Sequence, residues 1–584
     1  MEITRNNLLD ELDNIKKDLT KSCFVGLDAE FSALPGESCK HRLFDTSEER
    51  YATIKTELSN TIMTQVGLTM FQYNRNLDSY VAVCYTFHLC PQAFGDIDQR
   101  FIFQASTLNF LCKHKFDFNK FTYEGLPYLS KVEEATVRRN IKEKTLFNDL
   151  ARMLDMDEER QLQQYYSQVS KWLMRSKEET MYLEVDSPVF RYIAHTELRM
   201  RFPHILTTDS LGNSKKILIY RDKNVEGANS APMALLEDNL MSYLLGFSHV
   251  IALLEASRKP IVGHNILLDT ILLHNQFIGP LPNKYSEFKK NIHNMFPSLY
   301  DSKYISHEMA KKLSYHEVWK SNTLQNLYEF FSEAKCKKLQ SGLSFINLSR
   351  PFNVKQSYHE AGFDSFCAGY CFIRLGHWLA SENRGSYCPA GPTEMLSALA
   401  PHCNKVNIIR GAIPYMNFAG SDPPRHRPGL LHLKILAPQT INAGQVASDL
   451  AAFGSLDIKP YGNKTALIAT NSHQTAKKIL KELKNSKDYR IAPYSFYKHS
   501  RAGSMAICLG RSATGTRRAF WMTGGTSEST SRSTSPEKLP LPSKTDLYLS
   551  MISWVFLEYL HVTSLQNLTK PISRQALQDR RGIC

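Results

Sequence analysis

The feature that most constrains this chain is a short apolar run that ends in two acids spaced two residues apart. Residues 23–27 are apolar enough to form a buried strand, and Asp28 and Glu30 follow them. Side chains alternate across a strand, so both carboxylates should project from one face. Such a pair is costly to bury unless a cation neutralises it, and hard oxygen ligands favour Mg²⁺ or Mn²⁺. The alternative is a pair of solvated acids on an edge strand.

Two later stretches carry side chains of the same kinds. Residues 261–265 are predicted to form a strand that runs into a turn, and residues 266–277 a helix with Asp269 in its first turn. His359 and Asp364 lie five residues apart, so they do not stack on one helix face. Both can reach one cavity if His359 lies in the turn before a helix. Taken singly, Asp269 is an ordinary charge at a helix N-terminus, and His359 an ordinary core or surface histidine.

The five residues form an ordered pattern, Asp-x-Glu, then Asp, then His-x-x-x-x-Asp. This pattern resembles that of the DEDDh 3′-to-5′ exonucleases. The flanking sequence resembles the poly(A)-specific ribonuclease (PARN) family at residues 26–31, 116–121, 125–128, 263–269, 280–282 and 359–364. Residues 408–418, followed by Arg427 and Pro428, resemble the PARN-like domain-containing group, whose members trim piRNA 3′ ends in the germline. The resemblance covers about residues 20–497.

The resemblance implies an α/β chain with an RNase H-like DEDD exonuclease fold, in which helices flank a mixed sheet. It also implies a small inserted α/β module of a nucleic-acid-binding type and a C-terminal RRM-like α+β domain. The expected activity is a Mg²⁺-dependent 3′-to-5′ exoribonuclease that trims single-stranded RNA, with piRNA precursors as substrates and nucleoside 5′-monophosphates as products. The alternatives are a poly(A) deadenylase that acts on mRNA tails and a non-catalytic RNA-binding relative.

By resemblance, the catalytic residues are Asp28, Glu30, Asp269, His359 and Asp364. The family pattern implies two Mg²⁺ ions, for which Mn²⁺ can substitute. Asp28, Glu30 and Asp364 would hold one ion, and Asp28 would bridge to a second ion held partly by Asp269. His359 would act as the general base, because an imidazole titrates near neutral pH.

The resemblance also suggests substrate contacts. Asn265 and Lys303 would contact the terminal nucleotides, while Phe31 and Leu34 would border the end base. The alternatives are that Phe31 belongs to the core and that Lys303 is a solvated surface charge.

The predicted inserted module carries a second pair of candidate RNA contacts. Arg191 and His195 are four residues apart on a predicted helix and therefore share one face. An Arg-x-x-x-His pair resembles the small single-strand-binding module inserted in the PARN nuclease, although this spacing arises by chance in many helices.

Length and composition suggest several domains and a polyanionic partner. A chain of 584 residues should hold three or four domains. The net charge of +14 favours RNA or an anionic membrane surface. The twelve cysteines are scattered without a Cys-x-x-Cys pair, which favours free thiols in a reducing cytosol. Near the N-terminus, an amphipathic helix is predicted with Leu8, Leu9, Leu12 and Ile15 on one face.

The predicted domains follow from shifts in composition and pattern. They are a nuclease domain split between residues 1–150 and 240–400, an inserted module at 160–235, an RRM-like domain at 405–500, a disordered linker at 501–545 and a C-terminal apolar or docking segment at 546–584. Residues 428–497 have the order β-α-β-β-α-β, which is typical of an RRM-like fold. Residues 466–469 lack stacking rings, so that sheet face is expected to be a packing or dimer surface.

The C-terminal segment leaves membrane attachment open. Its apolar run at residues 547–557 is shorter than the span of about twenty residues that crosses a bilayer. The expected location is cytoplasmic, or the cytosolic face of the endoplasmic reticulum or mitochondrial outer membrane. Expected partners are the 3′ end of single-stranded RNA, a PIWI-bound piRNA precursor, a Tudor-domain adaptor and a second copy of the chain. A role in spermatogenesis is also expected.

Overall fold

The structure is a computed structural model that describes residues 1–36, 42–146, 154–210, 213–221, 231–313, 319–332, 344–349, 358–385, 390–436 and 440–495. The predicted linker at 501–545 and the predicted docking segment at 546–584 lie outside the described residues. Within the described ranges, no helix is long and apolar enough to cross a membrane. The cysteines in these ranges carry free thiols.

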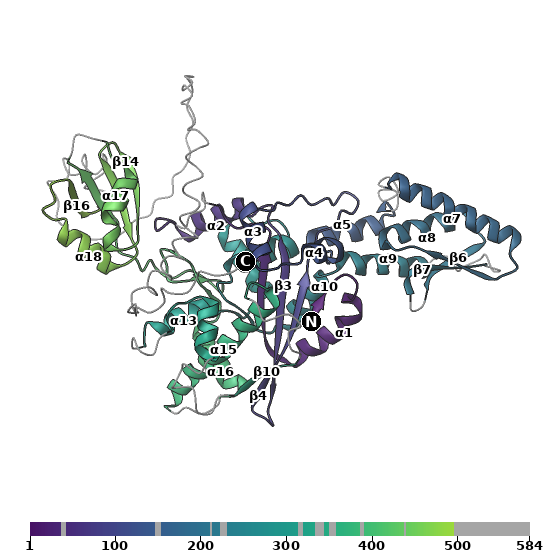
Figure 1. Ribbon diagram of the computed structural model, residues 1–584, viewed down its shortest axis with the longest axis horizontal. Coiled ribbons are helices and arrows are strands. Elements are labelled where there is room, and N and C mark those ends of the chain that lie inside the picture. The colour runs from purple at the N-terminus through teal and green to yellow at the C-terminus, as the bar shows by residue number, and fades with distance from the viewer. Residues whose placement is uncertain are drawn as a thin grey trace, which may run out of the picture. The chain divides into compact units, whose positions relative to one another are not determined.

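A mixed sheet forms the centre of the fold (Figure 1). Among the described residues its strands are β1 (Glu2–Ile3), β2 (Ser22–Phe31), β3 (Met63–Asn74), β4 (Ser79–His88), β8 (Ile261–Gly263), β9 (Leu299–Asp301) and β10 (Phe345–Leu348). Their order is β1-β4-β3-β2-β8-β9, and β10 pairs with β4. β2, β3 and β4 are antiparallel, whereas β8 runs parallel to β2 and β9 parallel to β8. Strands from both sides of the inserted module therefore share one sheet.

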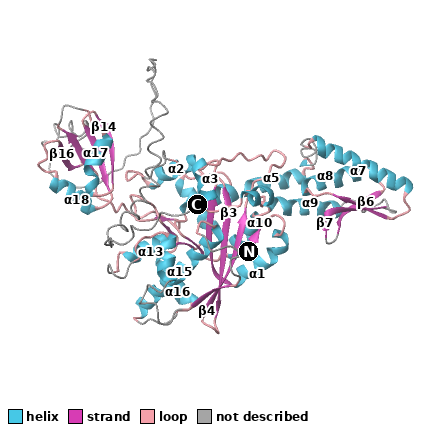
Figure 2. Cartoon of the chain, in the orientation of Figure 1, coloured by secondary structure: helices cyan, strands magenta, loops and turns pink. Residues whose placement is uncertain are grey.

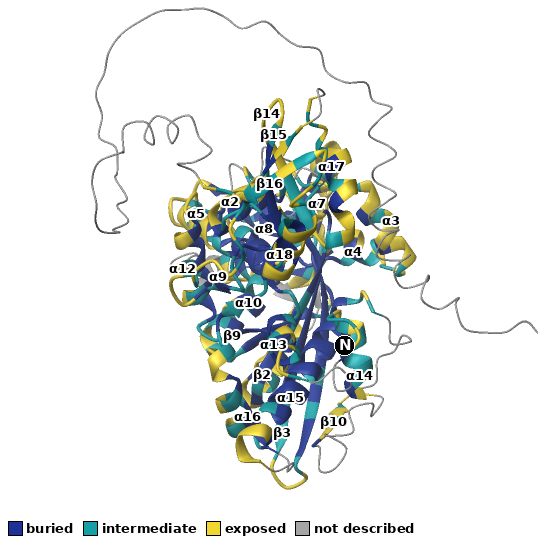
Figure 3. Ribbon diagram, turned by 90° about the vertical axis from the view of Figure 1, so that its left-hand side faces the viewer, coloured by how far each residue is buried: buried dark blue, intermediate teal, exposed yellow. Residues whose placement is uncertain are grey.

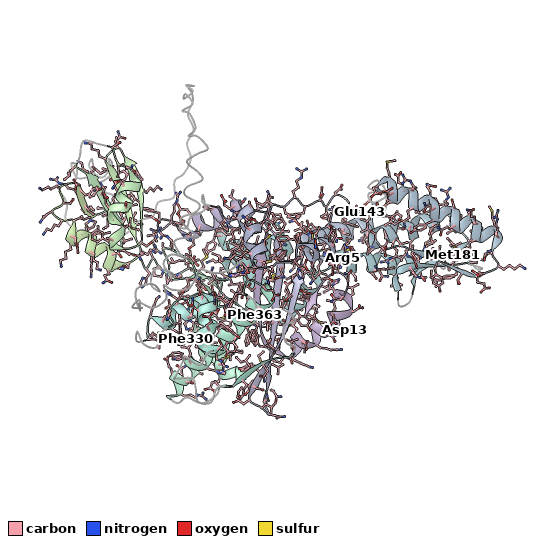
Figure 4. The ribbon with its side chains drawn as sticks, in the orientation of Figure 1. Arg5, Asp13, Glu143, Met181, Phe330 and Phe363 are labelled. Atoms are coloured by element: carbon pink, nitrogen blue, oxygen red, sulfur yellow. The ribbon has the colours of Figure 1, made fainter. Side chains whose placement is uncertain are left out.

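Helices cover both faces of this sheet (Figure 2). One core includes side chains of α1 (Leu8–Lys21), α2 (Ser47–Glu57), α10 (Ser248–Ser257), α11 (Leu267–Leu273) and α12 (Tyr285–Met295). The opposite core includes side chains of α13 (Ser302–Ala310), α14 (Leu324–Ser332), α15 (Ala361–Arg384) and α16 (Pro392–Leu399). Phe330 and Phe363 lie in this second layer (Figure 4). The sheet therefore separates two apolar cores.

Alternation along β2 decides which way its acids point. Val25 and Leu27 pack into the first core, and Phe24 packs into the second. A period of two places Asp28 and Glu30 on the same side as Phe24, which is the side that α15 covers. The predicted shared face of the two carboxylates therefore follows from the strand itself.

Helix α15 approaches the sheet closely at two glycines. A Cβ atom added at Gly67 would lie 1.8 Å from the carbonyl oxygen of Ala361, and one added at Gly26 would lie 2.3 Å from that of Ser365. Nearly all of α15 is buried (Figure 3), as expected for a helix that is apolar on most of its circumference. The two glycines thus let the first turn of α15 lie directly on β2 and β3.

The N-terminal helix has a narrower buried face than its sequence suggests. Leu8, Ile15 and Leu19 of α1 are buried, and Leu12 packs partly against the core. The prediction was wrong for Leu9, which is 56% exposed. Adjacent helical residues are about 100° apart, so Leu8 and Leu9 cannot both face the sheet.

The inserted module has an apolar core of its own. It contains α7 (Met156–Arg175), β5 (Thr180–Glu184), α8 (Pro188–Arg201), β6 (Ile205–Ser210) and β7 (Asn213–Arg221), with the antiparallel strand order β5-β7-β6. Helix α9 (Ala231–Leu245) contacts α8 of this module, whereas α4 (Phe118–Glu124) contacts β4 of the central sheet. The chain also contains α3 (Ala105–Lys113) and α5 (Lys131–Lys142).

The C-terminal part of the described chain is a separate α+β unit. Its elements are β13 (Leu431–Ile435), α17 (Ala443–Leu450), β14 (Leu456–Gly462), β15 (Thr465–Thr470), α18 (His473–Glu482) and β16 (Tyr489–Pro493). The strands form an antiparallel sheet in the order β14-β15-β13-β16. The predicted β-α-β-β-α-β order is confirmed, and its RRM-like nature stays a prediction. A short ribbon of β11 (Lys405–Val406) and β12 (Met416–Asn417) precedes it.

Candidate active site

Four carboxylates from three elements, β2, α11 and α15, lie close enough to influence one another's charge. Asp28 and Glu30 project from β2, and Asp364 lies in the first turn of α15. Asp269 lies in the first turn of α11, as its sequence predicts. β8, which leads into α11, pairs in parallel with β2, so Asp269 comes close to the two acids of β2.

The carboxylates of this cluster have raised pKa values. Burial and the negative charges of Asp364 and Asp269 raise the pKa of Asp28 well above its usual value. The same causes raise the pKa of Glu30. Burial raises the pKa of Asp269 to about 7 and that of Asp364 to about 7. The cluster therefore holds more negative charge than its surroundings stabilise at neutral pH.

The residues of this cluster fit a divalent cation. Glu30, His359 and Asp364 each offer one ligand atom, and these atoms lie within 4.8 Å of one another. Oδ1 of Asp364 is buried and has no hydrogen-bond partner among the described residues. A buried carboxylate oxygen without a donor is stabilised by a cation, and oxygen-rich sites suit Mg²⁺ and Mn²⁺. The roles of the four acids as metal ligands stay predictions.

His359 occupies the turn immediately before α15, the arrangement in which His359 and Asp364 can reach one cavity. Its backbone is in the left-handed region, with φ of 70°, and its N–H donates to Oδ2 of Asp364 at 2.9 Å. Its ring lies against Phe110 and His114, with centroid distances of 4.8 Å and 4.2 Å. Burial, together with the charges of His114 and Lys113, lowers the pKa of His359 to about 4. The imidazole is therefore neutral at pH 7 and able to accept a proton.

Sequence reasoning missed Glu360, which adds a further acid beside the cluster. Its carboxylate caps α15 by accepting from the N–H of Phe363 at 3.0 Å, and Oγ1 of Thr86 donates to it at 2.8 Å. Oε1 of Gln65 accepts from the N–H of Ala361 at 2.9 Å, which ties the same turn to β3. An acid directly before an apolar helix is the signal that could have revealed this cap.

The predicted contacts Asn265 and Lys303 are held by a single buried side chain. Oδ1 of Asp301, at the end of β9, accepts from the N–H of Asn265 at 2.8 Å and from that of Lys303 at 3.0 Å. Asp301 was not among the predicted residues, because its importance depends on strand order. β8 and β9 are neighbours, and this pairing brings residues almost forty positions apart into contact.

The other two predicted base contacts differ in exposure. Leu34 is 50% exposed, and its N–H donates to Oε1 of Gln104 at 3.0 Å. Phe31 is only partly buried and packs against the first core. Its position agrees with the core alternative, and contact with an RNA base stays a prediction for both residues.

Arg191 and His195 lie in the inserted module. His195 is fully buried, and its Nδ1 atom is 2.7 Å from Oγ1 of Thr207. Arg199, one turn further along α8, donates to the same oxygen at 2.8 Å. Nη1 of Arg191 donates to the carbonyl of Val185 at 3.5 Å. The His195 ring therefore joins α8 to β6 inside the module, and RNA contact by this pair stays a prediction.

Comparison with known proteins identifies the family to which this site belongs. A family model described as CAF1 family ribonuclease matches residues 3–372, which include all five predicted catalytic residues. The chain belongs to the CAF1 family of ribonucleases. This match confirms the predicted ribonuclease family and the RNase H-like class of fold.

Proteins of similar sequence cover most of the chain. It is 61% identical over 516 residues to the pre-piRNA 3′-exonuclease trimmer of Bombyx mori, which covers 88% of this chain and 97% of that protein. It is 29% identical to the poly(A)-specific ribonuclease PNLDC1 of Mus musculus, over 86% of this chain and 95% of that protein. It is 27% identical to the poly(A)-specific ribonuclease PARN of Homo sapiens, over 85% and 80%. The predicted PARN likeness and the 3′-to-5′ exoribonuclease class are thereby confirmed.

One solved structure resembles part of the chain. The Mg²⁺- and Mn²⁺-bound form of S. pombe Pop2p matches with a TM-score of 0.30 and 15% identity, over 64% of this chain and 90% of that chain.

Proposed function

We propose that this 3′-to-5′ exoribonuclease trims single-stranded RNA and that piRNA precursors are its substrates. The observation that carries the proposal is the 61% identity to the Bombyx mori pre-piRNA trimmer across 88% of the chain. Deadenylation of mRNA tails is the second candidate, because more distant relatives are named poly(A)-specific ribonucleases. The higher identity and coverage favour trimming.

The four acids and His359 divide the expected chemistry between them. Asp28, Glu30, Asp269 and Asp364 would hold the cations, which relieves the mutual repulsion that raises their pKa values. Two bound Mg²⁺ ions would supply Lewis-acid stabilisation of the attacking and leaving oxygens.

His359 would take the proton of the attacking water. Its backbone N–H bond to Asp364 ties it to the cluster, and its pKa of about 4 keeps it neutral at physiological pH. The product would be a nucleoside 5′-monophosphate and an RNA one nucleotide shorter with a new 3′-hydroxyl.

Partners and location extend the proposal. A PIWI-bound precursor would present its 3′ end to this site, with a Tudor-domain adaptor and a second copy of the chain as further candidate partners. We place the protein in the cytoplasm of germline cells, including those of spermatogenesis, with membrane attachment as an open alternative. The net charge of +14 supports an RNA partner through counterion release.

The test uses purified full-length protein and two RNAs of equal length, one mixed in sequence and one poly(A). Each is labelled at the 5′ end in one reaction and at the 3′ end in another, with Mg²⁺, with Mn²⁺ or with a chelator. We expect stepwise shortening of the 5′-labelled RNA, early loss of the 3′ label, dependence on the cation and similar rates on both sequences. Strong preference for poly(A) would instead support deadenylation.

A matched pair of variants ties the activity to the site. Asp28→Asn keeps the size of the side chain and removes its charge, so trimming should be lost. Asp13→Asn makes the same change at an exposed position of α1 and should leave the rate unchanged. Equal rates in Asp28→Asn and the unmodified protein would overturn the assignment of the site.

A further inference from the structure

A segment beyond the family match lies alongside the candidate active site. Residues 404–407 follow the region that matches the CAF1 family, which ends at residue 372. The N–H of Asn404 donates to the carbonyl of Leu299 at 2.7 Å, and the N–H of Leu299 donates to Oδ1 of Asn404 at 3.1 Å. Nδ2 of Asn404 also donates to the carbonyl of Pro297 at 2.8 Å. This segment is therefore fastened to the start of β9.

Asp301 links this segment to the two predicted nucleotide contacts, Asn265 and Lys303. Its side chain is fully buried, and both of its oxygens accept hydrogen bonds. Oδ1 accepts from the backbone of Asn265 and Lys303, whereas Oδ2 accepts from the N–H of Asn407 at 2.8 Å. One carboxylate thus fixes the backbone of three segments that are far apart in the sequence.

The side chain of Asn407 makes a direct contact with that of Asn265. Its Nδ2 group donates to Oδ1 of Asn265 at 2.8 Å. A carboxamide has one oxygen that accepts and one NH₂ group that donates. Because the oxygen of Asn265 already accepts from Asn407, the NH₂ group of Asn265 is the part that can donate to a ligand. The backbone of Asn265 has φ of 64°, a conformation that asparagine adopts more readily than most residues.

We propose that Asn407 is a positioning residue for RNA, which holds the carboxamide of Asn265 so that its Nδ2 group donates to the 3′-terminal nucleotides. This inference rests on the proposed function. An RNA end offers acceptors in its phosphate and sugar oxygens, and a fixed donor suits them better than a carboxamide that can turn over. The segment after the family region then contributes to substrate binding without touching the RNA itself.

The test compares Asn265→Ala, Asn407→Ala and the double variant in steady-state trimming of a 5′-labelled, mixed-sequence RNA with Mg²⁺. Loss of one oriented hydrogen bond should raise the KM of each single variant about tenfold, while kcat changes by less than about twofold. If Asn407 acts through Asn265, the double variant should be no worse than Asn265→Ala. Multiplied effects in the double variant would overturn the proposal.

The variant Asn407→Asp tests the direction of the hydrogen bond between the side chains of Asn407 and Asn265. A carboxylate of the same shape accepts and cannot donate, so it should draw the Nδ2 group of Asn265 toward itself and raise the KM at least as much as Asn407→Ala. Unchanged KM in Asn407→Asp would contradict the proposed orientation. The backbone N–H that binds Asp301 is kept in both variants, which favours an intact fold.

Asn417→Ala is the matched control for these variants. It removes an asparagine of the adjoining strand β12, whose Nδ2 group donates to the carbonyl of Ser421 at 3.0 Å, away from Asn265. Its KM should equal that of the unmodified protein. The unmodified protein is assayed on the same RNA, so the absence of any trimming there would reject the proposed function separately from the role of Asn407.

Discussion

The crowding of the carboxylates leads to a quantitative prediction for the stability of the metal-free protein at different pH values. Asp269 is buried, and its pKa is raised from 3.8 to about 7 in the folded chain. Because the folded-state pKa lies above the unfolded-state value, protonation favours the folded chain. This stabilisation is complete below about pH 4 and is lost as the pH rises through 7. For one such group, the free energy of unfolding should fall by roughly 3 kcal/mol between about pH 5 and pH 8.

Asp269→Asn removes this titration while keeping the size of the side chain. The unmodified protein, freed of metal with a chelator, should melt at a lower temperature at pH 8 than at pH 5. In Asp269→Asn, that difference should shrink by roughly 6 °C, taking about 2 °C for each kcal/mol in a domain of this size. Comparing the two pH values within each variant cancels any cost of the substitution that does not depend on pH.

Thermal melts followed by circular dichroism at the two pH values measure this effect, and denaturant titrations give the corresponding free energies. Asp13→Asn is the control, because Asp13 lies on α1 (Figure 4) and is exposed. Its pH dependence should match that of the unmodified protein. If Asp269→Asn also shows the full drop in melting temperature between pH 5 and pH 8, the pH dependence of stability does not come from Asp269.

Further predictions concern the metal, the packing of α15 and the ion pair between Lys289 of α12 and Asp422. Adding Mg²⁺ at pH 8 should raise the melting temperature of the unmodified protein, and much less that of Asp28→Asn, which lacks a predicted ligand. Gly67→Ala would place a Cβ atom 1.8 Å from the carbonyl oxygen of Ala361 and displace the first turn of α15, so trimming should fall by roughly a hundredfold. Lys289→Met leaves the partly buried Asp422, its partner at 2.9 Å, without a cation, and a denaturation experiment should show a loss of roughly 3 kcal/mol in the free energy of unfolding.

Local patterns in the sequence predicted the elements that carry the site. The alternation in β2 fixes the shared face of Asp28 and Glu30, because a strand has a period of two. The order of elements at residues 428–497 was also readable, since each helix and strand there has a clear periodicity. A helical pattern predicts burial less well at the edge of an apolar face. Leu9, one residue after the buried Leu8, is exposed.

The sequence alone therefore determined the ordered pattern of acids and the family that this pattern indicates, while the cation that these acids favour stays a prediction. The tertiary structure decided which distant residues support them. Asp301 matters because the pairing of β8 with β9 brings it beside Asn265, and Glu360 is placed beside Thr86 of β4 by the packing of α15 on the sheet. Asn407 reaches Asn265 across 142 positions for the same reason. Such contacts depend on strand order and close packing, which periodicity within one segment does not encode.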